Sequence, residues 1–245
     1  MRFKCKVCGR DDEIIGDSSP HCLYCNVPLL RATESYAGLL MSPEIVLRRM
    51  KTLVEKHGLS RVENGPFKHE REAWSTAIYA LALSEINGKK YWVEIETSAQ
   101  TPDSYLHCID QSSGSNVDQI QSIEVVDWEE HNNDLLTLVE KKVKKAYPQH
   151  YCLLITGRSG QLLEPHAFAT KLLELTIPFA EIWIIGMPAY DTVNIARLFP
   201  DVMVKHFALS KALIAAKTEY SFMVKQQRGF STEFVPLGSI YLPIP

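Results

Sequence analysis

The chain has 245 residues, of which 46% are hydrophobic and 22% are charged, and its formal net charge is −3. This length suits one core of moderate size with a small additional domain. The slightly acidic charge argues against a broad basic surface for nucleic acid, although a local groove can still be basic. No window approaches about 20 uninterrupted apolar residues, and the start, MRFKCKVCGR, is no signal peptide, so we expect no membrane contact.

Two CxxC pairs stand near the N-terminus, Cys5 with Cys8 and Cys22 with Cys25. A CxxC pair delivers two thiolates from one tight turn, and two such pairs supply the four ligands of a tetrahedral zinc site. The sequence therefore predicts a structural zinc ribbon over residues 1–32, with a disulfide pair or stray thiols as the minor alternative. Zinc-type cysteines without a secretion signal indicate a reducing, cytoplasmic environment.

Residues 33–66 are expected to form a linker that carries one amphipathic helix. Ser42, Pro43 and Glu44 provide an N-cap, a proline at the first helical position and an early acid. The helix should stop at Gly58. The breaker sequence Asn-Gly-Pro at 64–66 then predicts that the main domain begins at residue 67.

Residues 67–190 are expected to form the main domain. Its hydrophobic patterns predict helices at 70–86, 134–146 and 165–175 and strands at 91–98, 104–109, 122–128, 150–157 and 181–187. The order α-β-β-β-α-β-α-β predicts an α/β fold in which helices flank a mixed central sheet. Cys108 and Cys152 lie in apolar runs and are expected to be buried thiols.

The last part of the chain, 191–245, gives a weaker pattern. We expect helices at 191–199 and 210–220, with a strand between them at 202–208. The tail at 234–245 holds three prolines among apolar residues, so it cannot be a regular helix and is expected to lie extended. A partner-docking role for this tail is the alternative.

Three features of the main domain carry a family resemblance: the order of its elements, Pro102-Asp103 before the second strand, and Glu124 inside the third strand. Together they resemble the restriction-endonuclease-like superfamily, the PD-(D/E)XK nucleases, with an α-β-β-β-α-β core. The resemblance implies that Asp103 and Glu124 lie side by side on adjacent strands and hold a divalent metal, Mg²⁺ or Mn²⁺. It also implies that an acid from the first helix completes the site.

Elementary chemistry supports part of this implication. Mg²⁺ prefers oxygen ligands and usually takes one or two carboxylates, which leaves room for water and phosphate. Alternation places Glu124 on one strand face with Val126 and Trp128, an awkward position for an acid that has no metal or hydrogen-bond partner. On the first helix, Glu70 is in line with the apolar stripe and is the expected third acid; Glu72 is the reserve.

The sequence departs from the family at one position. The resemblance implies a lysine two residues after the second acid, and residue 126 is a valine. Val126 cannot orient water or neutralise charge on a phosphate. Lys141, Lys142 and Lys145 on the following helix are candidates to replace it, although solvent-exposed positions are the commoner role of such lysines.

Two functions follow as hypotheses. The first is a metal-dependent nuclease that hydrolyses DNA phosphodiesters, in defence or DNA processing, with Glu70, Asp103 and Glu124 in catalysis and Asp103 and Glu124 as magnesium ligands. The second is an inactive nuclease-like adaptor that binds nucleic acid or a protein partner through the zinc ribbon and the C-terminal tail. The missing lysine and the acidic charge favour the adaptor, and the retained acids favour the enzyme.

Overall fold

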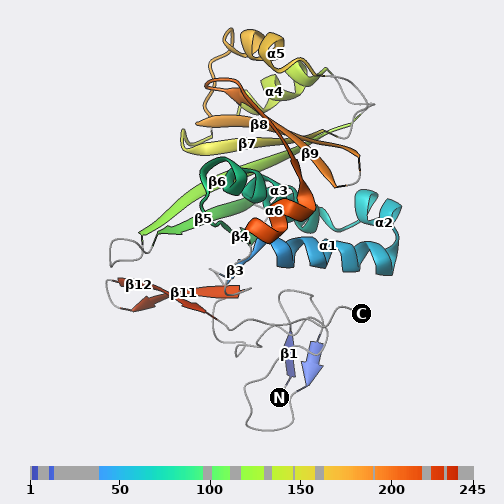
Figure 1. Ribbon diagram of the computed structural model, residues 1–245, viewed down its shortest axis with the longest axis vertical. Helices are drawn as coiled ribbons and strands as arrows, with labels where there is room; N and C mark the ends of the chain where they lie inside the picture. The colour runs from blue at the N-terminus through green and yellow to red at the C-terminus, as the bar shows by residue number, and fades with distance from the viewer. Residues whose placement is uncertain are drawn as a thin grey trace. The chain divides into compact units, whose positions relative to one another are not determined.

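The computed structural model describes the backbone of residues 2–4, 11–13, 39–95, 101–110, 117–129, 134–145, 147–157, 163–189, 191–216, 222–228 and 231–236 (Figure 1). The chain divides into two compact units, Ser42–Lys217 and a second unit of Met1–Met41 with Thr218–Pro245. The cysteines of the expected zinc ribbon, Cys5, Cys8, Cys22 and Cys25, lie outside the described residues.

The second unit contains short antiparallel pairs of strands. β1 (Arg2–Lys4) pairs with β2 (Asp11–Glu13). β3 (Leu39–Met41) pairs with β11 (Phe222–Arg228), which also pairs with β12 (Ser231–Pro236). The sequence patterns predicted neither β11 nor β12. The tail was expected to lie extended over 234–245, and its described part, 234–236, forms the end of β12.

The larger unit holds the expected α/β arrangement. Its helices are α1 (Pro43–His57), α2 (Leu59–Asn64), α3 (Lys68–Asn87), α4 (Leu135–Val143), α5 (Pro165–Leu172) and α6 (Leu209–Ala215). Its strands are β4 (Trp92–Ile95), β5 (Ser104–Asp110), β6 (Val117–Trp128), β7 (Tyr151–Gly157), β8 (Glu181–Ala189), β9 (Thr192–Phe199) and β10 (Met203–Ala208). None of the helices in the described ranges is long and apolar enough to cross a membrane.

The strands of this unit follow the order β10-β9-β8-β7-β6-β5-β4. β6, β7 and β8 are parallel to one another, whereas β4, β5, β9 and β10 pair antiparallel with their neighbours. The predicted mixed sheet with flanking helices is therefore confirmed. β7 is buried along almost its whole length, as expected for a parallel strand covered on both faces.

Helices cover both faces of the sheet (Figure 1). On one face, α4 and α5 pack on Trp128 of β6, Leu153 of β7 and Ile184 of β8 in one hydrophobic cluster. On the other face lies α3, whose Tyr79 packs against Trp183 with ring centroids 5.4 Å apart. Cys108 and Cys152 are buried thiols, as predicted.

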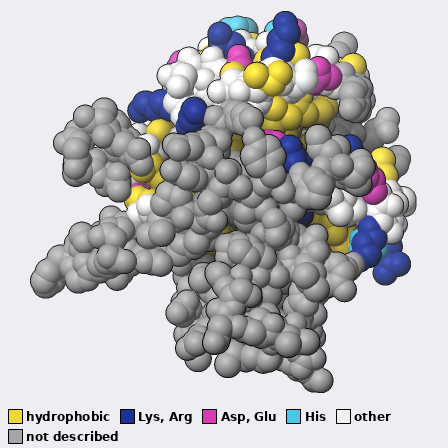
Figure 2. Space-filling model, turned by 60° about the horizontal axis from the view of Figure 1, so that its bottom comes forward, with side chains coloured by type: hydrophobic (Ala, Val, Ile, Leu, Met, Phe, Trp, Pro, Cys, Tyr) yellow, Lys and Arg dark blue, Asp and Glu magenta, His cyan; other side chains and the backbone are white. Residues whose placement is uncertain are grey.

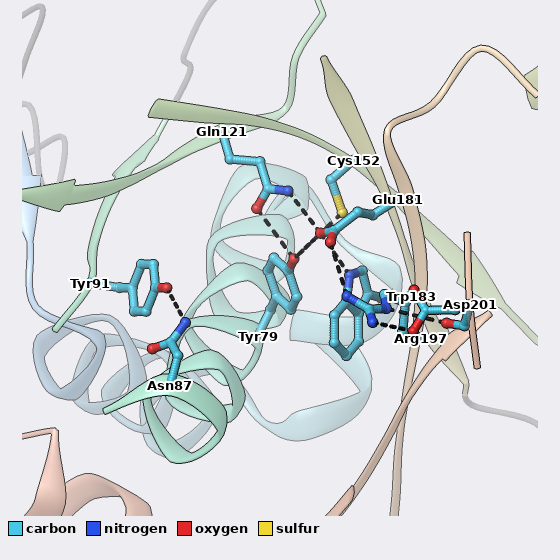
Figure 3. Close-up of polar contacts among 9 residues, drawn as sticks. All are labelled: Tyr79, Asn87, Tyr91, Gln121, Cys152, Glu181, Trp183, Arg197 and Asp201. Atoms are coloured by element: carbon cyan, nitrogen blue, oxygen red, sulfur yellow. Dashed lines mark hydrogen bonds and ion pairs between the residues drawn. The ribbon is translucent and has the colours of Figure 1, made fainter. Parts of the chain in front are cut away.

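The α3 face also carries a polar network around one carboxylate (Figure 3). Glu181 Oε2 accepts hydrogen bonds from Tyr79 Oη at 3.2 Å, Gln121 Nε2 at 3.1 Å and Trp183 Nε1 at 3.0 Å. Arg197 reaches Oε1 of the same glutamate at 3.5 Å. The network connects α3 to β6, β8 and β9.

The start of α1 follows the sequence prediction. Ser42 caps the helix, because its side chain accepts from the Ile45 amide at 3.5 Å, and Pro43 occupies the first turn. The helix ends at Gly58, whose φ of 81° is a backbone conformation that glycine adopts most easily. The short α2 that follows was not predicted.

Two expectations were wrong. The segment at 191–199 was predicted to be helical, but residues 192–199 form strand β9, paired with β8 on one side and β10 on the other. Its alternating burial, with Val193, Ile195 and Leu198 inside, reflects this position in the sheet. β6 is also longer than predicted, since residues 117–121 of the expected loop pair with β5.

Candidate functional site

The candidate site lies at the start of β5. Beyond this point β6 has lost β5 as a partner and pairs only with β7. Ser104, the first residue of β5, is opposite Ile123, whereas β6 extends to Trp128 with β7 as its parallel partner. A pocket of about 290 Å³ opens at this point. It is lined by three cationic and four acidic residues together with two valines, namely Lys68, Arg71, Glu72, Asp103, Glu124, Val125, Val126, Asp127 and Lys142.

Asp103 forms two hydrogen bonds with β6 where the pairing with β5 ends. Its amide donates to the Ile123 carbonyl at 3.0 Å, and its Oδ2 accepts from the Val125 amide at 2.8 Å. That amide lies beyond the last β5–β6 pair, where the carboxylate of Asp103 takes the place of a strand partner. This bond holds the side chain of Asp103 beside the backbone of the strand that carries Glu124.

Glu124 is buried, and its two oxygens have very different surroundings. Oε1 accepts from Lys142 Nζ at 2.6 Å and from Tyr147 Oη at 2.8 Å. Oε2 is buried and has no hydrogen-bond partner among the described residues. A buried polar atom without a partner costs about 1–3 kcal/mol, so the arrangement favours a further donor or a cation at Oε2.

Tyr147 is fixed in its role as a donor to Glu124. Burial and the hydrogen bond to the Glu124 carboxylate raise the pKa of Tyr147 far above its usual value. The hydroxyl therefore keeps its proton at any physiological pH. Tyr147 was not singled out from the sequence, because nothing in its local pattern distinguishes it from an ordinary core tyrosine.

Glu72 and Lys68 supply the helix side of the pocket. Lys68 Nζ is 2.8 Å from Glu72 Oε1 and 3.6 Å from Asp103 Oδ1, so one ammonium group bridges two carboxylates. Burial raises the pKa of Glu72, an effect that the hydrogen bond from Lys68 opposes and the charge of Asp103 reinforces. The same hydrogen bond raises the pKa of Lys68, although partial burial opposes it.

The structure places Glu72, and not Glu70, at this pocket. Glu70 instead forms an ion pair with Arg49 of α1, with 3.0 Å between Nη2 and Oε1. The expectation for Glu70 assumed one apolar stripe on α3. The middle of α3 is buried around most of its circumference, so no single stripe marks the inward side. Glu72, named as the reserve, is only 5% exposed.

Of the three lysines named as replacements for the missing motif lysine, Lys142 reaches the pocket. Lys141 and Lys145 are exposed. Val126 lines the same pocket without a charge. The structure thus brings together Asp103, Glu124, Glu72 and Lys142, and adds Lys68 and Arg71, which the sequence patterns did not indicate. The position of Lys68 four residues before Glu72 was the available signal.

The donor set suits a hard divalent cation. Four carboxylates line one pocket, and the Oε2 atoms of Glu72 and Glu124 accept no hydrogen bond from the described residues, although His69 Nδ1 lies 3.4 Å from Oε2 of Glu72. In the described part of the chain, however, no group of three or more His, Cys, Asp or Glu side chains is already close enough to hold a metal. Lys68 bridges Glu72 and Asp103 and Lys142 pairs with Glu124, so a metal would have to displace at least the more exposed Lys68.

Described residues on one face of the molecule carry charges of both signs (Figure 2). On the face drawn in Figure 2, the Lys and Arg side chains of the described residues form small separate groups, with Asp and Glu among them. This distribution agrees with the net charge of −3.

No protein-family model, no curated protein and no solved structure matches this chain. Fold and pocket geometry are consequently the basis for assigning a function.

Proposed function

We propose that the protein is a metal-dependent nuclease of the restriction-endonuclease-like kind, with its site in the pocket of Glu72, Asp103, Glu124 and Lys142. The observation that carries the proposal is the arrangement of Glu124. One carboxylate oxygen accepts from Lys142 and Tyr147, and the other is buried in the acid-lined pocket with no hydrogen-bond partner in the described part of the chain. A purely structural carboxylate would have both oxygens satisfied.

Glu72, Asp103 and Glu124 would hold the metal, Mg²⁺ or Mn²⁺. When bound, such a metal lowers the pKa of a water ligand and neutralises charge on a scissile phosphate. Lys142 keeps an ammonium group beside Glu124, where it can stabilise negative charge that develops on the phosphate. Asp103 is oriented by the Val125 amide, so its carboxylate is positioned before substrate arrives.

Two glutamates on one helix provide the test. We expect wild-type protein with Mg²⁺ or Mn²⁺ to nick supercoiled plasmid and Glu72→Gln to lose this activity. Glu70→Gln, the same substitution two residues away at the Arg49 pair, is the matched control and should remain active. Equal rates for the two variants, both measured on folded protein, would contradict the proposal.

The second candidate function is an inactive adaptor, with DNA or a protein as the partner. A specific observation favours it: Lys68 and Lys142 already neutralise the acids of the pocket, as they would in a structural ion-pair network. In that case no divalent metal should bind at the pocket. Glu72→Gln would then change the free energy of unfolding, and there would be no cleavage activity for it to affect.

A further inference from the structure

A second pocket, of about 480 Å³, lies in the same unit, beside the acid-lined pocket. Its walls come from α1, α2, α3, the end of β7 and β8; Glu63 and Arg71 are charged, and the rest is mainly apolar, with Met50, Val54, Val62, Trp74, Ile185 and Met187. Its volume lies in the range of about 300–1,000 Å³ that is usual for pockets that bind small organic groups.

Arg71 belongs to both pockets. Its Nη1 donates to the carbonyl oxygens of Val62 at 2.8 Å and Gly65 at 3.3 Å, which fixes the guanidinium group at the end of α2. Its Nε is buried and has no hydrogen-bond partner among the described residues. Arg71 is thus a fixed cation with an unused donor, and it is shared by the acid-lined pocket and the apolar pocket.

A nucleotide has matching chemistry in one covalent unit, because an anionic phosphate is joined through the sugar to a flat aromatic base. A phosphate at the acid-lined pocket would approach the guanidinium of Arg71 and the ammonium groups of Lys68 and Lys142. The base attached to it would meet the apolar walls, where Trp74 supplies an aromatic surface. Bases stack on such surfaces with little dependence on sequence.

We propose that the apolar pocket receives one unpaired nucleobase of the substrate, next to the phosphodiester that lies at the acid-lined pocket. This inference rests on the proposed nuclease function and narrows its substrate class. A base inside a duplex is stacked and paired, so it must leave the helix before it can enter a pocket. The substrates are accordingly single-stranded DNA or duplexes with a locally unpaired nucleotide.

The test measures binding separately from cleavage. Full-length protein with Asp103→Asn, which prevents cleavage, is titrated into a labelled duplex that carries one unpaired nucleotide, whose position fixes the register of binding. One salt concentration is used throughout, since affinity for nucleic acid depends on salt. The strand with the unpaired nucleotide is then scanned with a single abasic site at each position. We expect this duplex with its unpaired nucleotide intact to bind more tightly than a fully paired blunt duplex. An abasic site at one position should weaken binding roughly 5- to 150-fold, the range expected from the loss of one stacked base.

Variants locate the effect. Met50→Trp fills the apolar pocket and should abolish the difference between intact and abasic strands. Val54→Phe serves the same purpose if the tryptophan disturbs folding. Thr52→Trp places the same side chain at an exposed position of the same helix, outside the pocket, and should retain the difference.

The outcomes separate the two proposals. A flat abasic scan, or equal effects of Met50→Trp and Thr52→Trp, overturns the assignment of this pocket to a base. If Glu72→Gln abolishes cleavage while the scan is flat, the nuclease stands and the base pocket falls. If one abasic position weakens binding but the wild-type protein does not cleave DNA, the pocket binds a nucleotide and the nuclease function is wrong.

Discussion

Lys142 of α4 donates from Nζ to Oε1 of Glu124 on β6 across 2.6 Å, although the two residues are 18 positions apart in the chain. Val126, two residues after Glu124, lines the same pocket. A cation therefore stands beside the second acid even though the position expected to hold it carries an apolar side chain. The helix that follows the strand supplies the charge that the strand lacks.

The first prediction concerns this ammonium group. If the protein cleaves DNA, Lys142→Met should lower the cleavage rate about 10²- to 10³-fold, the usual effect of removing one preorganised donor. Lys141→Met, an exposed neighbour on the same helix, should leave the rate unchanged. Initial rates of plasmid nicking provide the measurement. An active Lys142→Met protein would show that the group is structural.

Moving the charge back to the strand gives the second prediction. In the Lys142→Met background, Val126→Lys should recover about tenfold to a hundredfold of the lost rate, because residue 126 lines the same pocket as Glu124. The comparison is between the double and the single variant in the same nicking assay. Activity in Val126→Lys alone, with none in wild type, would instead mark the natural protein as an inactive scaffold.

The third prediction concerns competition between Lys68 and the metal. Lys68 Nζ lies 2.8 Å from Glu72 and 3.6 Å from Asp103, and its side chain is 66% exposed. Lys68→Met should tighten Mn²⁺ binding by up to about fivefold, which corresponds to the roughly 1 kcal/mol that an exposed ion pair contributes. Calorimetric titration of Mn²⁺ measures this. Weaker Mn²⁺ binding in the variant would mean that Lys68 supports the metal site.

His107 gives a prediction about pH. Its side chain is 1% exposed, with Nε2 2.9 Å from Glu94 Oε2 and Nδ1 3.0 Å from Asp118 Oδ2. Burial alone would lower the pKa of His107, but the hydrogen bonds and charges of Asp118 and Glu94 outweigh it and raise the pKa above its usual value. The imidazolium therefore contributes stability that is fully present below about pH 6.5, the pKa in unfolded chains.

That contribution is lost as pH rises through the higher folded-state pKa. At pH 6, His107→Gln should lower the free energy of unfolding by about 1.5–3 kcal/mol, the range for hydrogen bonds to charged groups. The difference from wild type should shrink at pH 9. Urea unfolding at both values measures it, with His150→Gln at an exposed position as the control. A difference that grows with pH would contradict a protonated His107.

The fifth prediction comes from the sequence alone. We expect one zinc per chain, bound by Cys5, Cys8, Cys22 and Cys25, because two CxxC pairs supply a complete tetrahedral set of thiolates. Elemental analysis of protein purified without added metal should give a ratio near one. Cys22→Ser should lose the zinc while the unit Ser42–Lys217 unfolds at the same urea concentration. Metal-free wild-type protein would contradict the prediction.

The sequence predicted the fold best where its patterns were strong. The N-cap residues at the start of α1 indicate a helix, and the short apolar run of β7 indicates a strand covered on both faces. The segment 191–199 was ambiguous, because its apolar residues fit a short helix as well as a strand. Pairing with β8 and β10 decides its structure, and such long-range pairing leaves no local signal.

The site was predictable from its strands more than from its helices. Asp103 and Glu124 were expected from the resemblance in motif and element order, alternation supported Glu124, and both residues line the pocket. The choice between Glu70 and Glu72 depends on how α3 is rotated on the sheet, and the choice among three lysines depends on how α4 packs. Both rotations are set by tertiary contacts that a single sequence does not display.

Polar contacts settle the rotation and the axial position of α3. On its buried side Thr156 of β7 donates to Ser75 at 2.8 Å, Thr76 lies 2.6 Å from Ser104 of β5, and Tyr79 donates to Glu181 of β8. Apolar packing alone would tolerate a small slide of the helix, whereas these directional bonds would all break together. The distance between Glu72 and the strand carboxylates is thus built into the core. In the described residues no three acids are yet close enough to share a divalent metal, so any approach of Glu72 to the strand carboxylates would come from rotation of its side chain and not from movement of its helix.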